Sequence, residues 1–379
     1  MTGQGADVAR QAAAGLGGRV CVPERLAAEG EQGFASFGEA VARYWPTARG
    51  HVFVAATGIV VRCIAPLLRH KADDPAVVVC DQAGRFAISL LSGHLGGANA
   101  LAERVAACLG GQAVITTATD SAGLPAFDVL ARDAGCAFAD IHEVKAVSAA
   151  LLDGSPVAVH DPLGVLDARA VAACPYCLPL SGRFADVAQA VRAALSPEAP
   201  EREPGGAAVC VSLAPLTSAP GRLRLHPRRV AVGVGCRKGV DGKALVRAVL
   251  AALDGAGCSP LAVACLASAE LKSEEPGLHE AARALGVPLH FFSAERLAAY
   301  EVPSPSAKAA EVLAVERVGV CEGAALCAAG ERGVLFAPKA RFDAAGAPRV
   351  DGPGAITVAL AYGPAYSAVP PCVGLADNR

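Results

Sequence analysis

The sequence signal that decides the fold is FAISLLSGHLGGANALAERVAACL, residues 86–109. It starts with six mostly apolar residues of strand type and continues through a glycine-rich turn at 92–99. From Ala98 to Leu109, apolar residues recur at helical spacing, so that one stripe of a helix can be buried. A strand, a tight turn and a helix in succession are typical of a layered α/β sheet.

Strand-like and helix-like segments alternate on both sides of this stretch. The other strand-like segments of the first third are RVCVP from Arg19, HVFVAAT from His51, AVVVC from Ala76 and AVITT from Ala113. The same alternation recurs from Asp128 to Leu213 and again from Arg229 onward. We therefore predict a multi-domain α/β protein of layered α/β/α units, whose sheets are mixed or parallel.

Domain boundaries follow from these groups and from the length. A chain of 379 residues is long enough for two or three domains. We place an N-terminal α/β domain at 1–127, a small middle α/β domain at 128–214 and a C-terminal α/β domain at 229–363. The linker is placed at 215–228, where Pro, Gly and charged residues are frequent.

Composition excludes several classes of function. Hydrophobic residues make up 53% of the chain and charged residues 18%, which indicates a packed core. Lys and Arg total 34 against 36 for Asp and Glu, so no overall field attracts nucleic acid or an anionic membrane. The apolar runs are shorter than the roughly 20 residues of a membrane span, and no secretory signal is readable. We expect no nucleic-acid or membrane partner and a cytoplasmic location.

The fourteen cysteines are scattered, mostly within apolar segments, and are expected to be reduced core residues. The one close pair, Cys174 and Cys177 in CPYC, has no second pair or His cluster nearby, whereas a structural zinc takes four ligands. We therefore predict no metal site, with a metal or redox role of CPYC as a minor alternative.

The turn at 92–99 is the densest candidate site. Its glycines let the backbone approach a ligand closely, and free N–H groups at a helix start favour an anion beside His94. The alternative is that the glycines form only a tight turn and that a polar side chain caps the helix. The residues that we expect to bind substrate here are Ser92, Gly93, Gly96, Gly97 and Asn99.

Other strand ends carry matching polar groups. The segment TTATD at 116–120, which includes Thr117, follows a strand, and ligands usually bind at strand ends in open α/β sheets. Arg62 and Lys71 follow the strand at 51–57. Cations on this edge can pair with substrate carboxylates; the alternative is that they are solvated surface charges.

A second glycine-rich segment, GVGCRKG at 233–239, also follows a strand. It is superficially similar to a dinucleotide fingerprint, but its third glycine comes one position late. Its cations and backbone donors suit a carboxylated ligand as well as a phosphate. The mixed-charge segment at 267–278 follows the next strand and is otherwise typical of a solvated helix start. The candidates from both segments are Arg237, Lys238, Glu270 and Lys272.

Together these motifs resemble the cobalt-precorrin-5A hydrolase family of anaerobic cobalamin synthesis, the CbiG proteins. The resemblance spans nearly the entire chain and rests on the block at 57–102, on ITTATD at 115–120 and on GVGCRKG, LASAELKSEEPGL and VGVCEGAAL in the last third. The family usually begins with a β-strand ahead of a segment like GADVARQAAAGLG, whereas five residues precede Ala6 here. We expect either a start codon assigned too far downstream or a member without this edge strand.

The resemblance implies an enzyme that opens the δ-lactone formed from the ring A acetate of a cobalt corrinoid and releases acetaldehyde. Such a substrate carries many carboxylates, which fits cationic, glycine-rich strand ends of the first and third domains facing one anionic ligand. Cobalt enters with the substrate, so no cofactor is implied. A homodimer and transient contact with neighbouring pathway methyltransferases stay open. The alternatives are a non-catalytic carrier of a corrinoid intermediate and a nucleotide-dependent enzyme.

Lactone hydrolysis requires a base that activates water and donors for the developing oxyanion. We expect His94 to be the general base, kept neutral because the positive end of a nearby helix lowers the pKa of its imidazole. Backbone N–H groups around Gly96 and Gly97 are expected to hold the oxyanion. Asp120 or Asp81 is expected to orient the imidazole.

Overall fold

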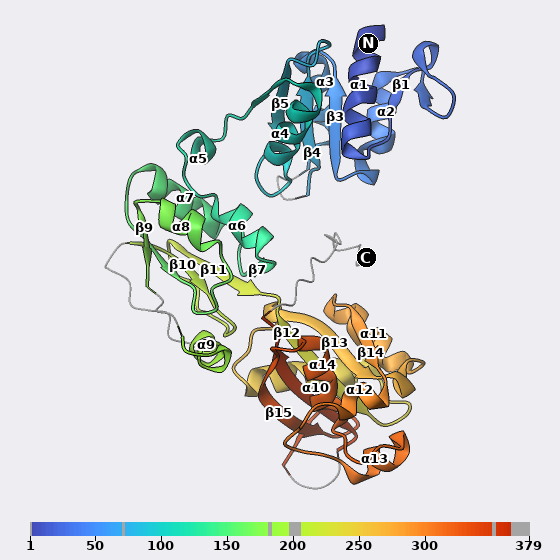
Figure 1. Cartoon of the computed structure of the whole chain (residues 1–379), viewed down its shortest axis with the longest axis vertical. Helices are drawn as coiled ribbons and strands as arrows, with labels where there is room; N and C mark the ends of the chain where they lie inside the picture. The colour runs from blue at the N-terminus through green and yellow to red at the C-terminus, as the bar shows by residue number, and fades with distance from the viewer. Residues whose placement is uncertain (1, 70–72, 181–183, 197–205, 351–353, 365–379) are drawn as a thin grey trace. The chain divides into compact units, whose positions relative to one another are not determined.

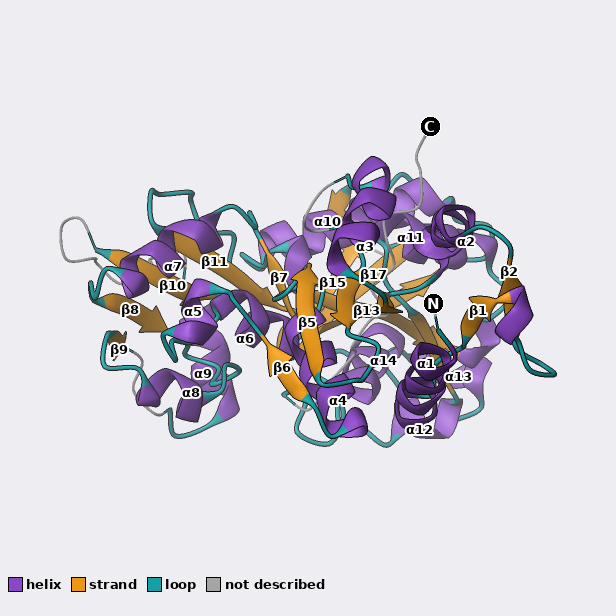
Figure 2. Cartoon of the chain, turned by 90° about the horizontal axis from the view of Figure 1, so that it is seen from above, coloured by secondary structure: helices purple, strands orange, loops and turns teal. Residues whose placement is uncertain are grey.

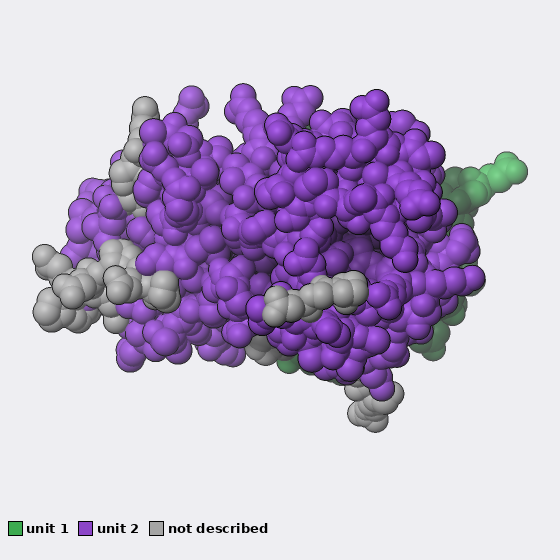
Figure 3. Space-filling model, turned by 90° about the horizontal axis from the view of Figure 1, so that it is seen from below, with its two compact units in different colours: residues 1–129, 374–379 green, residues 130–373 purple. Residues whose placement is uncertain are grey.

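The computed structural model describes residues 2–69, 73–180, 184–196, 206–350 and 354–364. The chain divides into two compact units, which comprise residues 2–129 and 130–364 of the described chain and are coloured separately in Figure 3. Both units consist of strands and helices in alternation, so the predicted α/β, multi-domain fold class is confirmed (Figures 1 and 2). In the described part of the chain, no helix is both long and apolar enough to cross a membrane.

The first unit is built on a mixed sheet with the strand order β3-β4-β5-β6. Its strands are β3 (Gly50–Val54), β4 (Ala76–Cys80), β5 (Phe86–Leu91) and β6 (Gln112–Val114). β3 and β4 are parallel, β4 and β5 antiparallel, and β5 and β6 parallel. The carboxyl ends of β5 and β6 therefore lie at one edge of the sheet, and those of β3 and β4 lie at the opposite edge.

Helices cover both faces of this sheet, because β4 alternates apolar side chains between them. Val78 packs in the layer of α1 (Gly3–Leu16) and α4 (Ala98–Leu109), and Val79 packs in the layer of α2 (Phe37–Tyr44) and α3 (Thr57–Ile64). The other elements of the unit are β1 (Cys21–Pro23), β2 (Gln32–Phe34) and α5 (Ala118–Ser121). β1 and β2 pair in a separate parallel sheet.

The second unit begins within α6 (Phe127–Asp133) and contains a sheet with the order β7-β11-β10-β8-β9. The strands are β7 (Cys136–Phe138), β8 (Val157–His160), β9 (Cys177–Pro179), β10 (Ala207–Val211) and β11 (Arg222–Pro227). The helices around it are α7 (Glu143–Leu152), α8 (Ala168–Ala173) and α9 (Val187–Ala194).

The segment 215–228, which we expected to be a linker, contains β11. This strand pairs with β10 on one side and with β7 on the other, and its residues Leu223 and Leu225 are fully buried. The alternation of Arg and Leu at 222–225 is a strand pattern that places both leucines on the core side. The surrounding Pro and Gly residues obscured this pattern, so the linker prediction is wrong for the second half of the segment.

The remaining sheet has the order β14-β13-β12-β17-β15-β16. Its strands are β12 (Val230–Cys236), β13 (Val263–Ala269), β14 (Leu289–Phe292), β15 (Val334–Phe342), β16 (Pro348–Arg349) and β17 (Ile356–Tyr362). The helices that accompany it are α10 (Gly242–Gly255), α11 (Pro276–Leu285), α12 (Ala294–Ala298), α13 (Ala307–Leu313) and α14 (Val320–Ala329).

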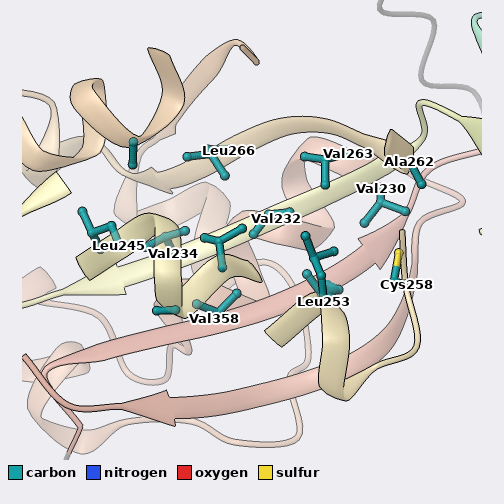
Figure 4. Packing of buried hydrophobic residues seen from close by; sticks show 14 of the residues in the cluster. Val230, Val232, Val234, Leu245, Leu253, Cys258, Ala262, Val263, Leu266 and Val358 are labelled. Carbon is teal, nitrogen blue, oxygen red and sulfur yellow. The ribbon is translucent and has the colours of Figure 1, made fainter. Parts of the chain in front are cut away.

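The core of this sheet lies on the two faces of β12. On one face, Val232 and Val234 pack with Leu245 of α10 and with Val358 of β17 (Figure 4). Val191 of α9 belongs to the same cluster, which joins the middle and C-terminal sheets into one compact unit. On the other face, small residues of β12 allow α14 to pack closely.

Candidate functional site

The loop between β5 and α4 is tightly folded. Ser92 has a φ of 56°, a left-handed conformation that is uncommon outside glycine, and Gly97 has a φ of 85°. A Cβ at Gly96 would collide with the side chain of Ser92, and one at Gly93 would lie 2.8 Å from Oδ1 of Asn99. The fold of the loop itself therefore requires glycine at these positions. This agrees with the alternative interpretation of the motif, in which the glycines form only a tight turn.

Three backbone donors at the end of this loop are already engaged. The N–H groups of Gly97, Ala98 and Asn99 each donate, at 3.0 Å, to a carbonyl oxygen earlier in the same loop. The oxyanion hole that we expected around Gly96 and Gly97 therefore lacks the N–H of Gly97, because closing the turn uses it.

His94 lies between two carboxylates. Its Nε2 is 2.8 Å from Oδ2 of Asp120 on α5, and its Nδ1 is 3.3 Å from Oδ2 of Asp128 on α6. The hydroxyl of Thr119 lies 3.3 Å from Nε2. The side chain of His94 is 22% exposed, compared with 10% for Asp128 and 38% for Asp120. Since a carboxylate only accepts hydrogen bonds, this arrangement favours a ring that carries a proton on both nitrogens.

The hydrogen bond to Asp128 is the largest cause of a pKa for His94 that is raised to about 9; burial acts against it, and the contact with Asp120 adds to it. This direction is opposite to the one we expected. The partial charge of a helix end is weaker than two full carboxylates in contact with the ring, so their effect dominates. At pH 7 His94 is therefore an imidazolium, and the expectation of a neutral base is wrong.

Hydrogen bonds connect Asp120 to the sheet. The hydroxyl of Thr117 donates to Asp120. Nδ2 of Asn99 is 3.0 Å both from Oδ2 of Asp120 and from Oγ1 of Thr117, while its Oδ1 accepts from Ser89 of β5 at 2.7 Å. Burial alone would raise the pKa of Asp120, but the hydrogen bonds from Thr117 and His94 outweigh it and lower that pKa.

The parallel pairing of β5 and β6 explains why these groups meet, since His94 follows β5 and Asp120 follows β6. Asp81, the other residue expected to orient the imidazole, follows β4. Its carboxylate accepts from the N–H of Phe86, at the start of β5, at 2.9 Å. Six strand residues separate that point from the loop of His94, a distance of about 20 Å. Asp81 therefore does not orient His94.

The segment that carries Arg62 also starts at the opposite edge, because β4 and β5 are antiparallel. Arg62 is exposed on α3, and its Nη1 donates to the carbonyl of Gly58 at 3.1 Å. A mostly apolar cavity of about 620 Å³ opens at this edge, with Val54 and Ile59 in its lining. The expectation that Arg62 lies at the same edge as the polar groups that follow β5 and β6 is thus wrong. Lys71 lies outside the described residues.

In the second unit, the loops after the parallel strands β12 and β13 are joined by Glu275. Its Oε1 accepts from the N–H of Gly239 at 2.6 Å, and its Oε2 pairs with Nζ of Lys272 at 3.1 Å. The carboxylate of Glu275 is 8% exposed. Lys272 is therefore already half of an ion pair. The exposed neighbours are Arg237, Lys238 and Glu270.

The first glycines of the 233–239 segment serve packing. A Cβ at Gly233 would collide with the carbonyl of Cys321 on α14, and one at Gly235 would lie 2.6 Å from the hydroxyl of Thr357 on β17. A close helix at Gly233 and a close side chain of the neighbouring strand at Gly235, rather than a nucleotide, therefore explain why glycine occurs at these positions.

Sequence reasoning missed two members of the His94 site, Asp128 and Ser89. We placed Asp128 at the start of the middle domain, one residue beyond the first domain, whereas it contacts His94 within the first unit. The available signal was a carboxylate in the first turn of the helix after TTATD. Ser89 is a polar residue in an otherwise apolar strand, a pattern that often marks a hydrogen bond to a partner.

None of the cysteines that the structure describes forms a disulfide. Cys174 and Cys177 are both buried, and burial, together with a hydrogen bond involving Cys174, raises the pKa of Cys177 to about 12. A thiol that resists ionisation is a poor nucleophile and a poor metal ligand. Within the described residues, no three His, Cys, Asp or Glu side chains are grouped so as to hold a metal ion.

These features define the class: a multi-domain α/β protein with a histidine–carboxylate site at the edge of its first sheet. Three family patterns cover most of the chain: Cobalamin synthesis G N-terminal at 39–120, Cobalamin biosynthesis central region at 125–227 and Cobalamin synthesis G C-terminus at 230–361. The chain belongs to this cobalamin synthesis family, whose curated relatives are named cobalt-precorrin-5A hydrolase.

The cobalt-precorrin-5A hydrolase of Salmonella typhimurium is 35% identical over 307 residues, which are 79% of this chain and 82% of the relative. The cobalt-precorrin-5A hydrolase of Priestia megaterium is 30% identical over 286 residues, 73% of this chain and 74% of the relative. Among solved structures, CobE, a protein from the cobalamin biosynthetic pathway, is 32% identical. The match covers 36% of this chain and 91% of CobE, with a TM-score of 0.31.

Proposed function

We propose that this protein hydrolyses the ring A acetate δ-lactone of cobalt-precorrin-5A and then releases a two-carbon fragment as acetaldehyde. The observation that carries the proposal is the imidazole of His94 between Asp120 and Asp128, in a chain whose relatives are named cobalt-precorrin-5A hydrolase. Opening a lactone requires proton transfer to and from oxygen near neutral pH, and histidine is the side chain best suited to it.

The second step balances without a cofactor. Lactone opening leaves a free hydroxyl on the two-carbon fragment. When this hydroxyl loses its proton, its oxygen forms the C=O bond of acetaldehyde, the carbon–carbon bond to the macrocycle breaks, and the conjugated ring takes up the electron pair. The protein supplies position and proton transfer. Cobalt is part of the substrate in this proposal.

The test is anaerobic incubation of the full chain with cobalt-precorrin-5A. We expect acetaldehyde in equal amount to the substrate consumed, together with the matching loss of mass from the corrinoid. Tight binding without any product would instead identify a non-catalytic carrier. Stabilisation of the protein against heat by NAD, NADP or ATP would identify the nucleotide-dependent alternative.

We further propose that the exposed cations after β12 bind the peripheral carboxylates of the corrinoid, with the loop geometry held by the pair of Lys272 and Glu275. Arg237→Ala and Lys238→Ala are each expected to weaken substrate binding about tenfold while leaving most of the saturated rate, because a lost charge-assisted hydrogen bond is worth about 1.5 kcal/mol or more. Substrate titration followed by absorbance measures the affinity. The matched control is Arg283→Ala, which removes an exposed cation from α11. If all three variants bind the substrate as tightly as the wild type does, Arg237 and Lys238 are ordinary surface charges.

The location and the protein partners are also proposals. We place the enzyme in the cytoplasm, where thiols stay reduced and where the pathway methyltransferases that would hand over the substrate are expected. A homodimer is the second proposal, and size-exclusion chromatography with light scattering tests it. Co-purification with the neighbouring methyltransferases tests a transient contact with them.

A further inference from the structure

We propose that His94 acts in its cationic form, as the acid that protonates the leaving oxygen of the lactone, and that Asp128 is the positioning residue that holds it in this form. The inference rests on the proposed function and assigns the direction of proton transfer within it. It also assigns a role to Asp128, which neither the motif at 92–99 nor the one at 116–120 contains.

The geometry of the ring carries the first half of the proposal. A histidine that abstracts a proton from water must present a nitrogen lone pair to that water. Here Nε2 faces Asp120 at 2.8 Å and Nδ1 faces Asp128 at 3.3 Å. Two acceptors, one on each nitrogen, are satisfied only when both nitrogens carry a proton, so the resting ring is an imidazolium. The proton that passes to the leaving oxygen is the one on Nε2, because Nε2 faces the more exposed carboxylate, Asp120, while the more buried Asp128 keeps its contact with Nδ1.

The two carboxylates differ in what else they bind, and this difference selects Asp128 as the positioning residue. Oδ2 of Asp120 accepts hydrogen bonds from Thr117 and Asn99 in addition to His94. The carboxylate of Asp128 is more buried, and its Oδ2 faces His94 while its Oδ1 accepts from the N–H of Val129 at 3.0 Å. A buried carboxylate with fewer competing donors interacts more strongly with the imidazolium.

His94 alone accounts for both proton transfers of the hydrolysis. Water adds to the acyl carbon, the bond between this carbon and the ring oxygen breaks, and the departing oxygen takes the proton of the imidazolium. The proton that the added water must lose then passes to the neutral imidazole. The lactone has become a hydroxy acid, and His94 is again a cation. Protonating the leaving oxygen matters because an alkoxide is a poor leaving group at neutral pH.

The charges that face the ring determine its titration. Among the described residues, Asp120 from α5 and Asp128 from α6 face the ring, and both favour the cation. The hydroxyl of Thr119 near Nε2 is neutral. Since the pKa of His94 is about 9, an acid role predicts full activity at neutral pH and a loss of activity as the pH rises through about 9. A base role predicts the opposite, with activity that increases through the same pH.

The first experiment uses the free protein. Labelled histidine side chains of the full chain are titrated by NMR, and the signal of His94 is identified by its absence in His94→Gln. We expect His94 to titrate near 9 in the wild type and about 1–3 pH units lower in Asp128→Asn, the range that one neighbouring charge produces. The control is Asp133→Asn, which removes an exposed carboxylate from the same helix. A wild-type His94 that titrates at or below 6.5 overturns the proposal, even if Asp128→Asn does not fold.

The second experiment follows acetaldehyde release against pH. We expect the alkaline limb of the wild type near pH 9, its displacement to lower pH in Asp128→Asn, and partial return in Asp128→Glu. A purely structural role of Asp128 would lower the amount of folded enzyme without moving this limb. No turnover at any pH would overturn the proposed function and the acid role with it, whereas turnover that increases as His94 loses its proton would overturn the acid role alone.

Discussion

Replacing His94 by Asn is expected to lower the rate of acetaldehyde release about 10²–10⁴-fold, the usual contribution of an acid–base group, with substrate affinity changed by less than about tenfold. The amide of Asn can still donate a hydrogen bond to a carboxylate, so part of the contact with Asp120 or Asp128 persists. It cannot donate or take up a proton in the catalytic pH range. The measurement is the rate at saturating substrate, paired with a binding titration of the same preparation.

The matched control for this variant is His290→Asn, on an exposed position of β14 in the other unit, which should keep the wild-type rate. Melting temperature is recorded alongside activity, because removing the cation leaves two carboxylates facing each other. If His94→Asn is less stable but turns over at the wild-type rate per folded molecule, His94 is a structural residue and the proposed catalytic role is wrong.

Stability should also depend on pH through His94. Its pKa of about 9 in the folded state exceeds the ordinary value of roughly 6.5, so the two ion pairs contribute fully below pH 6.5 and are lost as the pH rises through about 9. The difference in melting temperature between the wild type and His94→Asn should therefore be larger at pH 6 than at pH 10. A difference that stays constant over this range would contradict the raised pKa.

Local patterns predicted the elements around the site well. β5 and α4 begin and end at the expected residues, 86–91 and 98–109, because strand-type and helix-type periodicity are both read within a short window. The contact between His94 and Asp120 was also foreseeable, since both follow strands that proved to be parallel neighbours.

The length of one connection in the sequence already indicates that Asp81 and Arg62 lie away from His94. Only five residues, 81–85, connect the strand that ends at Cys80 with the one that starts at Phe86. A connection of this length suits a hairpin, because a parallel crossover needs about a dozen residues or more. The antiparallel pairing of β4 and β5 therefore follows from chain length, and it moves Asp81 and α3 to the edge opposite His94.

The charge state of His94 could not be predicted in the same way. Its pKa depends on Asp128, which is 34 positions further along the chain and lies on a helix outside the motifs at 92–99 and 116–120. The sequence indicated the start of α4, whose positive end disfavours an imidazolium. It did not indicate that two carboxylates contact the ring. Contacts at a few ångströms outweigh the diffuse field of a helix end, so the effect that could be predicted was the smaller one.

The second large effect is expected at Gly233 in β12, where Gly233→Ala should lower the stability of the C-terminal sheet by about 3 kcal/mol, or about 6–12 °C in melting temperature. The added Cβ would collide with the carbonyl oxygen of Cys321 and lie 2.7 Å from the N–H nitrogen of Ala325. Both are backbone atoms of α14, so no side chain can rotate to make room, and the helix must move away from the sheet. Circular dichroism during heating measures the loss.

The matched control is Gly255→Ala, at the end of α10, where nothing lies within 4 Å of the position that a Cβ would take. The melting temperature of this variant should be unchanged or slightly higher, because Ala is the better helix former. If Gly233→Ala melts like the wild type but binds the corrinoid less tightly, the glycine serves ligand approach rather than helix packing, as the loop motif first suggested.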